Sequence, residues 1–302
     1  MPEFDAYLMV DWSAQSSPKS GEDAIWYCMA RRPRSQLILE EPKNVRTRHE
    51  AVSQIRSLLA HNVEKEVATL VGFDFPYGFP TGCTRALGLD SETVAPWRAL
   101  WDTLSRNIKD SPRNENNRFA VAAEFNNQIS GGPYPFWGCP EKHQYTTLSR
   151  KKTRVSLRIE LAEYRLTEER VRGAQSAWKL LGHGSVGSQA LLGIPYVARL
   201  RDDPSLRKVS RVWPFETGMA KLPSREDRDW LVLHAEIFPS MIKVKPRERE
   251  AKDAAQVRGL ARHFALMDDE GCLSRLFNVP TELSADEVHR VETEEGWILG
   301  VE

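Results

Sequence analysis

The sequence has few cysteines and no excess of charge of either sign. Its four cysteines, Cys28, Cys83, Cys139 and Cys272, lie far apart and form no Cys-x-x-Cys pair, which argues against a disulfide framework or a zinc ribbon. No apolar run approaches the roughly 20 residues of a membrane span. The first five residues also lack the basic start and apolar stretch of a signal peptide. We therefore expect a cytoplasmic protein with no membrane association.

The absence of net charge conceals an uneven distribution. The 302 residues contain 42 Lys and Arg and 42 Asp and Glu, a balance that by itself disfavours a nucleic-acid partner. Residues 141–215, however, contain 15 Lys and Arg against 7 Asp and Glu, whereas residues 248–302 contain 6 against 13. These are either two solvated faces, or a basic surface for a nucleic acid beside an acidic element that binds a cation.

Hydrophobic patterning predicts an α/β fold. Short apolar runs predict strands at 7–10, 24–29, 36–39, 68–73, 209–215 and 230–238. Helical spacing predicts helices at about 48–62, 95–109, 156–172, after Ser185, 248–267 and 285–295. Three consecutive strands favour an antiparallel meander, and the later alternation favours crossover connections, so we expect a mixed sheet with helices on both faces.

One segment does not fit this alternation. Residues 111–150 are rich in Asn, Pro and Gly, show little periodicity and are too long for an ordinary loop. The chain has no internal repeat and no low-complexity linker. We therefore expect one elaborated domain over residues 1–302, with an irregular insertion at about 111–180.

Acidic residues recur where apolar runs end. Asp11, Asp74 and Glu236 each close a predicted strand, and Asp253 lies in the first turns of the helix that follows. Each has an ordinary explanation taken singly: a turn former, a strand end, a partner of an arginine, or a solvated helix residue. Together they follow one positional rule, and carboxylates that meet at a sheet edge form an oxygen-rich site suited to Mg²⁺ or Mn²⁺. Such ions can activate water and stabilise the leaving oxygen in phosphodiester cleavage.

The order of elements and several fragments resemble a known family. The fragments VDWSA (10–14), GFDFPYGFP (72–80), WKLLGHGSVGSQ (178–189) with GIP (193–195), and AEIFP (235–239) are similar to uncharacterised bacterial proteins classed as predicted nucleases of the ribonuclease H-like fold. The resemblance implies a mixed sheet of five strands or slightly more, with helices on both faces. It also implies metal-dependent phosphodiester cleavage with Asp11, Asp74, Glu236 and Asp253 as metal ligands.

A glycine-rich loop precedes the helix expected after Ser185. Residues 182–187 fit the pattern Gly-x-Gly-x-x-Gly, with two aspartates about twenty residues further on, as in dinucleotide-binding sites. Against that interpretation, only residues 178–181 could form a preceding strand, and Gly193 and Pro195 should cut the helix short. Two interpretations remain: Ser185 caps the helix, or the loop binds a phosphate through Gly182, Gly184, Ser185 and Gly187.

The histidines and the insertion aromatics are weaker candidates. His234 alternates with Glu236 and so shares its face of the strand, but a hydrogen-bonded structural histidine is the commoner case. Tyr134, Phe136 and Trp137 could stack on bases, although an aromatic plug under a long loop is more common.

Three functions fit these observations. The first is a divalent-metal-dependent nuclease, or related phosphodiesterase, that uses the acids at the strand ends. The second is a small-molecule phosphotransferase of the actin-like or sugar-kinase type, in which the acids and the glycine loop hold a nucleotide and its Mg²⁺. The third is a non-catalytic nucleic-acid-binding module on the same fold. We favour the nuclease.

Overall fold

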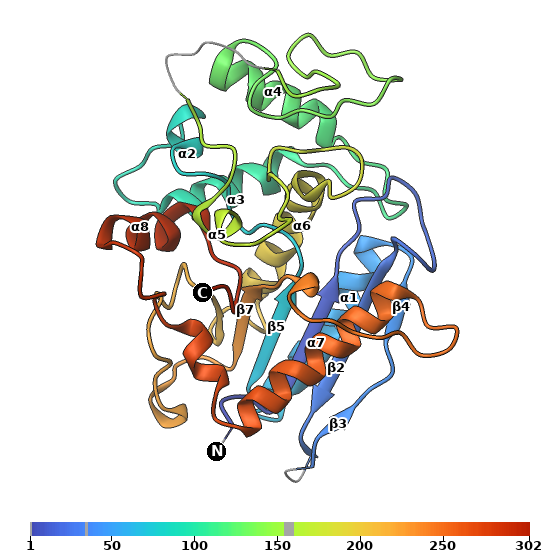
Figure 1. Ribbon diagram of the computed structural model, residues 1–302, viewed down its shortest axis with the longest axis vertical. Coiled ribbons are helices and arrows are strands. Elements are labelled where there is room, and N and C mark those ends of the chain that lie inside the picture. The colour runs from blue at the N-terminus through green and yellow to red at the C-terminus, as the bar shows by residue number, and fades with distance from the viewer. Residues whose placement is uncertain (1, 34–35, 154–159) are drawn as a thin grey trace.

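The computed structural model describes residues 2–33, 36–153 and 160–302. In these residues, seven strands form one mixed sheet in the order β3-β2-β1-β5-β7-β6, with β4 paired to β2 (Figure 1). The strands β1, β2 and β3 form the expected antiparallel meander, while β5, β7 and β6 run parallel to β1. The strands are β1 (Ala6–Asp11), β2 (Ile25–Arg31), β3 (Ile38–Leu39), β4 (Lys43–Val45), β5 (Thr69–Phe73), β6 (Ser210–Val212) and β7 (Val232–Glu236).

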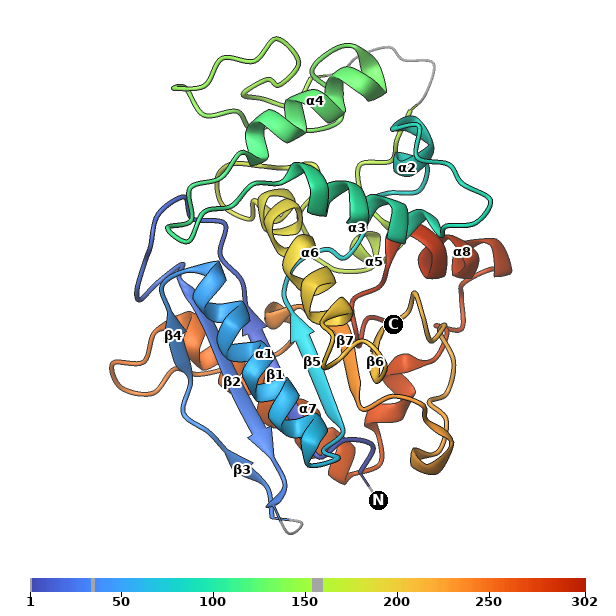
Figure 2. The same ribbon diagram turned by 180° about the vertical axis from the view of Figure 1, so that it is seen from behind.

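Helices cover both faces of this sheet. Helix α7 crosses one face in Figure 1, and α1 and α6 lie on the opposite face in Figure 2. In the described part of the chain, no helix has the length and the apolar character that a membrane span requires. The helices are α1 (Arg48–Glu64), α2 (Cys83–Ala86), α3 (Pro96–Asn107), α4 (Arg118–Ser130), α5 (Leu166–Glu169), α6 (Val186–Asp202), α7 (Lys252–Asp269) and α8 (Ala285–Arg290).

The two-residue period of β1 supplies a core on each face. Leu8 and Val10 belong to the buried cluster that includes Ile55 of α1, whereas Tyr7 and Met9 belong to the cluster that includes Leu260 of α7. Strand β5 is buried along its whole length, as its continuous apolar sequence predicts for a central parallel strand. The chain is therefore an α/β protein whose central strands are β1, β5 and β7.

Helix α6 differs from the prediction. Gly193 and Pro195 do not cut it short, and it continues through Pro195 to Asp202. Nearly all of its length is buried, so tertiary packing outweighs the weak local propensity. Gly193 packs against the ring of Phe75, which follows β5. A Cβ atom at position 193 would lie 2.3 Å from Cζ of Phe75, so the contact requires glycine.

The segment 111–180 is less irregular than expected. It contains α4, which lies at the top of Figure 1, away from the sheet. The hydrophobic pattern misses this helix because its buried face includes the polar residues Arg118 and Asn126, while Ala120 lies on its exposed face. Conversely, the helix expected at 156–172 is wrong for 160–165 and 170–172, since only α5 is helical there. Residues 156–159 lie outside the described residues.

Candidate functional site

Asp11 and Asp74 are neighbours across the centre of the sheet. The parallel register pairs Val10 of β1 with Phe73 of β5, so the residue that ends β1 and the residue that follows β5 occupy the next position of the ladder. The backbone N–H of Trp12 donates a 2.7 Å hydrogen bond to Oδ1 of Asp74, which fixes that carboxylate beside the end of β1. The structure thus brings together two of the four predicted acids.

Burial and negative charge act on both of these carboxylates. Burial, followed by the negative charge of Asp11, raises the pKa of Asp74 well above its usual range. Burial also raises the pKa of Asp11, with Asp253 and Asp23 as the next causes. Two buried carboxylates that repel each other would be stabilised by a bound cation or by a shared proton.

Asp253 reaches the same place from α7. It lies in the first turn of that helix, and its Oδ2 accepts a 2.8 Å hydrogen bond from the backbone N–H of Asp23 in the loop before β2. Burial raises the pKa of Asp253, and Asp23 is among the charges that add to this shift. Asp23 itself was not predicted, because an exposed aspartate in a polar loop carries no distinctive pattern.

Glu236 has a different environment. Both of its carboxylate oxygens accept hydrogen bonds from the guanidinium of Arg165, at 2.6 and 2.8 Å, and Oε2 also accepts from the N–H of Tyr77. Arg165 has no exposed side-chain surface, and it pairs with Glu168 as well. Its Nη1 further donates to the carbonyl of Glu295. The structure therefore places Glu236 in a buried ion-pair network rather than free beside Asp11 and Asp74.

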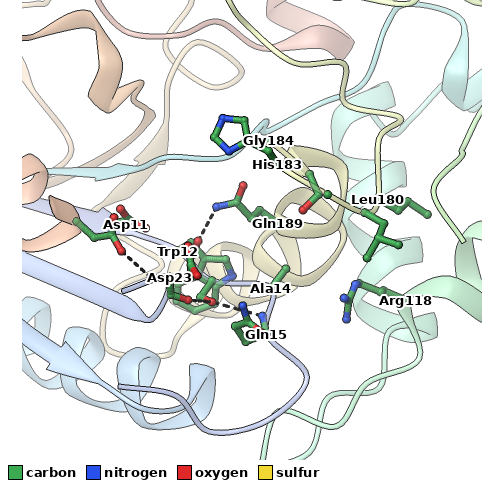
Figure 3. A pocket seen from close by; sticks show the side chains of 15 residues that line it. Asp11, Trp12, Ala14, Gln15, Asp23, Arg118, Leu180, His183, Gly184 and Gln189 are labelled. Atoms are coloured by element: carbon green, nitrogen blue, oxygen red, sulfur yellow. Dashed lines mark hydrogen bonds between the residues drawn. The ribbon is translucent and has the colours of Figure 1, made fainter. Parts of the chain in front are cut away.

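Asp11, Asp23 and Asp253, but not Asp74, line a pocket of about 450 Å³ (Figure 3). These three acids line one end of it, and Figure 3 shows Asp11 and Arg118 on opposite sides of the view. Between them lie the loop after β1 and the glycine-rich loop that precedes α6. The remaining lining residues are Trp12, Ser13, Ala14, Gln15, Leu180, Leu181, Gly182, His183, Gly184, Ser185 and Gln189.

The glycine loop has the geometry of an open helix N-terminus. Gly182 and Gly184 have positive φ angles of 92° and 68°, which suits glycine in particular. Ser185 occupies the N-cap position of α6, but its side chain makes no capping hydrogen bond. Ser185 is therefore the N-cap, as one interpretation predicted, through its carbonyl, which accepts from the N–H groups of Ser188 and Gln189, and not through its side chain. Ser185 and Gln189 border the pocket.

Gly187 serves packing. A Cβ atom at this position would lie 2.2 Å from the carbonyl oxygen of Ala177, and the N–H of Gly187 donates to the carbonyl of Lys179. It is buried and does not line the pocket. A dinucleotide-binding arrangement is also absent in the described chain, because the residues before the loop belong to no strand of the sheet. Asp202 and Asp203, at the end of α6, form ion pairs with Arg98 and Arg56.

Polar contacts from distant elements fix the loop after β1, which forms part of the pocket wall. Arg48, the first residue of α1, donates to the carbonyls of Ser13 and Gln15 at 2.9 and 2.8 Å, and it forms a bidentate pair with Asp110. Gln189 of α6 donates to the carbonyl of Trp12 at 2.6 Å. Sequence reasoning did not find these residues, since their partners lie tens or hundreds of positions away.

His234 conforms to its structural interpretation, whereas His183 does not. His234 is fully buried, and its Nε2 lies 2.8 Å from Oγ of Ser210 on the neighbouring strand. Burial lowers the pKa of His234 to about 3, so the ring is neutral at physiological pH. His183 is exposed in the glycine loop at the pocket.

The basic segment 141–215 is partly neutralised. Arg150 pairs with Glu141, Arg201 with Glu216 and Arg211 with Asp229, while Arg165 is buried. A surface excess of positive charge over this segment is therefore smaller than the residue count indicates.

Comparison of the chain with protein-family models, curated proteins and solved structures finds no match.

Proposed function

We propose that the chain has a ribonuclease H-like fold and is a divalent-metal-dependent nuclease. The topology supports the fold: an antiparallel β3-β2-β1 meander continues into parallel β5 and β7, with acids at the carboxyl ends of β1 and β5. The observation that carries the function is the pocket itself. It joins Asp11, beside Asp74, to a glycine-rich helix N-terminus suited to phosphate.

The donor set fits Mg²⁺ or Mn²⁺ in a limited form. Within the described residues, no three side chains of His, Cys, Asp or Glu are gathered closely enough to hold a metal by themselves. Mg²⁺ does not need such a cage, because it usually keeps several waters and binds one or two carboxylates plus substrate phosphates. Asp11 and Asp74 would hold the ion, with Asp253 as the third acid near it. Glu236, bound to Arg165, would anchor the fold.

Hydrogen bonds within the chain orient the acids that would bind the metal. A bound divalent cation would supply charge for the leaving oxygen and acidify water. The Trp12 N–H orients Asp74, and the Asp23 N–H orients Asp253. Arg48 and Gln189 hold the backbone of the loop after β1, so the position of Asp11 is set before any ligand arrives.

The test combines metal binding with cleavage. We expect calorimetry to detect Mg²⁺ or Mn²⁺ binding to the wild-type protein, and labelled DNA, RNA or hybrid oligonucleotides to be cut only with metal present. Asp74→Asn should lower both metal affinity and cleavage rate by roughly 100-fold or more, because it removes one of two ligand charges. Asp90→Asn, an exposed aspartate that does not line the pocket, is the matched control. Cleavage that survives in EDTA or in Asp74→Asn would refute the proposal.

A further inference from the structure

Arg118, the first residue of α4, is a buried cation at the pocket. The residue is only 7% exposed, yet it lines the pocket opposite Asp11 (Figure 3). Nε donates to Oγ of Ser188 at 2.9 Å, and Nη1 donates to Ser16 Oγ and Asn116 Oδ1 at 3.0 and 2.8 Å. All three acceptors are neutral, and Nη2 donates to no residue of the described chain.

This environment differs from that of the other buried arginines. Arg48 and Arg165 each form bidentate hydrogen bonds with a carboxylate, Asp110 and Glu236 respectively. Over residues 2–33, 36–153 and 160–302, no Asp or Glu forms an ion pair with Arg118. Burial lowers its pKa to about 10, so the guanidinium still carries its charge at neutral pH. The Phe119 ring, whose centroid lies 4.3 Å from Cζ of Arg118, and the charge of Asp110 stabilise the guanidinium in part. A buried charge with no carboxylate in contact is still costly, which favours an anion supplied from outside.

A second, independent feature points to the same ligand. The first turn of the 17-residue helix α6 borders the pocket, and its N-cap Ser185 leaves its side chain unused. Ser188, which accepts from Arg118, lies in that turn, so the guanidinium and the helix N-terminus are joined by a direct contact. In that turn the N–H groups of Gly187 and Ser188 already donate to the carbonyls of Lys179 and Ser185, but within the described residues those of the loop 182–185 donate to no carbonyl. Such loop N–H groups and a guanidinium fork are both suited to phosphate oxygens.

We propose that Arg118 and the loop 182–185 form a phosphate subsite, separate from the acids at Asp11 and Asp74. This inference rests on the proposed function and names its substrate class. Acids at one end of the pocket and a phosphate subsite at the other require a substrate with at least two phosphates. A nucleic-acid strand meets this requirement, with one phosphodiester at the acids and another phosphate at Arg118.

The test measures binding without metal. Fluorescence anisotropy of a labelled single-stranded thymidine oligonucleotide is recorded in EDTA for wild type, Arg118→Gln and Arg113→Gln. Arg113 is exposed and five positions away, so it matches the charge change. We expect Arg118→Gln to weaken binding roughly 10- to 100-fold and to reduce the slope of log affinity against log salt by about 1. Arg113→Gln should stay within about twofold of wild type.

A parallel arm uses inorganic phosphate, whose protection of the wild type against thermal unfolding should disappear in Arg118→Gln. If Arg118→Gln does not fold, Arg118→Lys carries the test, with binding intermediate between the wild type and background because Lys keeps the charge without the fork. Unchanged oligonucleotide affinity in a folded Arg118 variant would overturn the subsite. Phosphate binding without oligonucleotide binding would overturn the assignment to a strand.

These outcomes are separable from those of the proposed function. Oligonucleotide binding in EDTA involves neither the metal nor cleavage, and Asp74→Asn should retain it. A protein that binds the strand through Arg118 but never cuts it would refute the nuclease and leave the subsite standing. A protein that cuts with metal, yet binds equally well after Arg118→Gln, would do the opposite.

Discussion

The buried pair between Arg165 and Glu236 allows the role of Glu236 to be decided by stability. Glu236→Gln removes one charge but keeps nearly the same shape. Arg165, which has no exposed side-chain surface, then retains Glu168 as its carboxylate partner. Breaking a buried pair by removing one partner costs about 3–5 kcal/mol. Because Glu168 remains, we expect the lower end, about 3 kcal/mol, which is a large part of the 5–15 kcal/mol typical of a folded domain.

The assay is guanidinium unfolding followed by tryptophan fluorescence, since the chain has nine tryptophans. The midpoint should fall with the slope unchanged, and the loss should be the same with and without Mg²⁺. Glu163→Gln is the control, because Glu163 belongs to a more exposed pair with Lys152 and should cost less than about 1 kcal/mol. If Glu236→Gln were as stable as wild type but lost its Mg²⁺ affinity, Glu236 would be a metal ligand and our reasoning would be wrong.

Three further predictions concern other buried groups. Asp74→Asn should stabilise the metal-free protein by about 1 kcal/mol, because it removes the burial cost and the repulsion by Asp11 that raise the pKa of Asp74; lower stability in denaturant unfolding would contradict it. His234 has a lowered pKa of about 3, so between pH 6.5 and 3 the unfolded chain binds a proton that the native state does not. The free energy of unfolding should therefore fall by up to about 1.4 kcal/mol per pH unit on acidification through this window. The variant His234→Gln should show a smaller pH dependence when the two proteins are compared by urea unfolding from pH 7 to 4. Gly193→Ala should destabilise the protein by about 1–3 kcal/mol, because the new Cβ atom clashes with Phe75. Alanine normally stabilises a helix relative to glycine. A raised melting temperature would therefore refute the contact.

Local patterns predicted the framework of the molecule well. The apolar runs and helical spacings located β1, β2, β5, β7, α1, α3 and α7, because each of these elements buries one face or a continuous stretch. The rule that acids close the strands also found Asp11 and Asp74, since adjacent parallel strands end at the same edge of a sheet.

The remainder depends on contacts between residues far apart in the chain. Glu236 follows the same positional rule as Asp11, yet Arg165, 71 residues away, takes both of its oxygens. Arg118 lies 70 residues from Ser188, and no local pattern distinguishes it from an exposed arginine. Such partners become visible only when the fold brings the segments together.

The π-helical turn η5 (Val291–Glu295) near the chain's last residue has a consequence for Asp74. The carboxylate of Glu294 accepts from the N–H groups of Gly82 and Thr84, and that of Glu295 accepts from Thr81. The carbonyls of the same two glutamates press against Gly78, where a Cβ atom would lie 2.1 Å from the Glu294 oxygen. The turn η5 thus contacts residues 78–84, in the loop that follows β5 and Asp74. Loss of η5 would remove the carboxylates that accept from residues 81–84 and the carbonyls that lie against Gly78, four residues after Asp74.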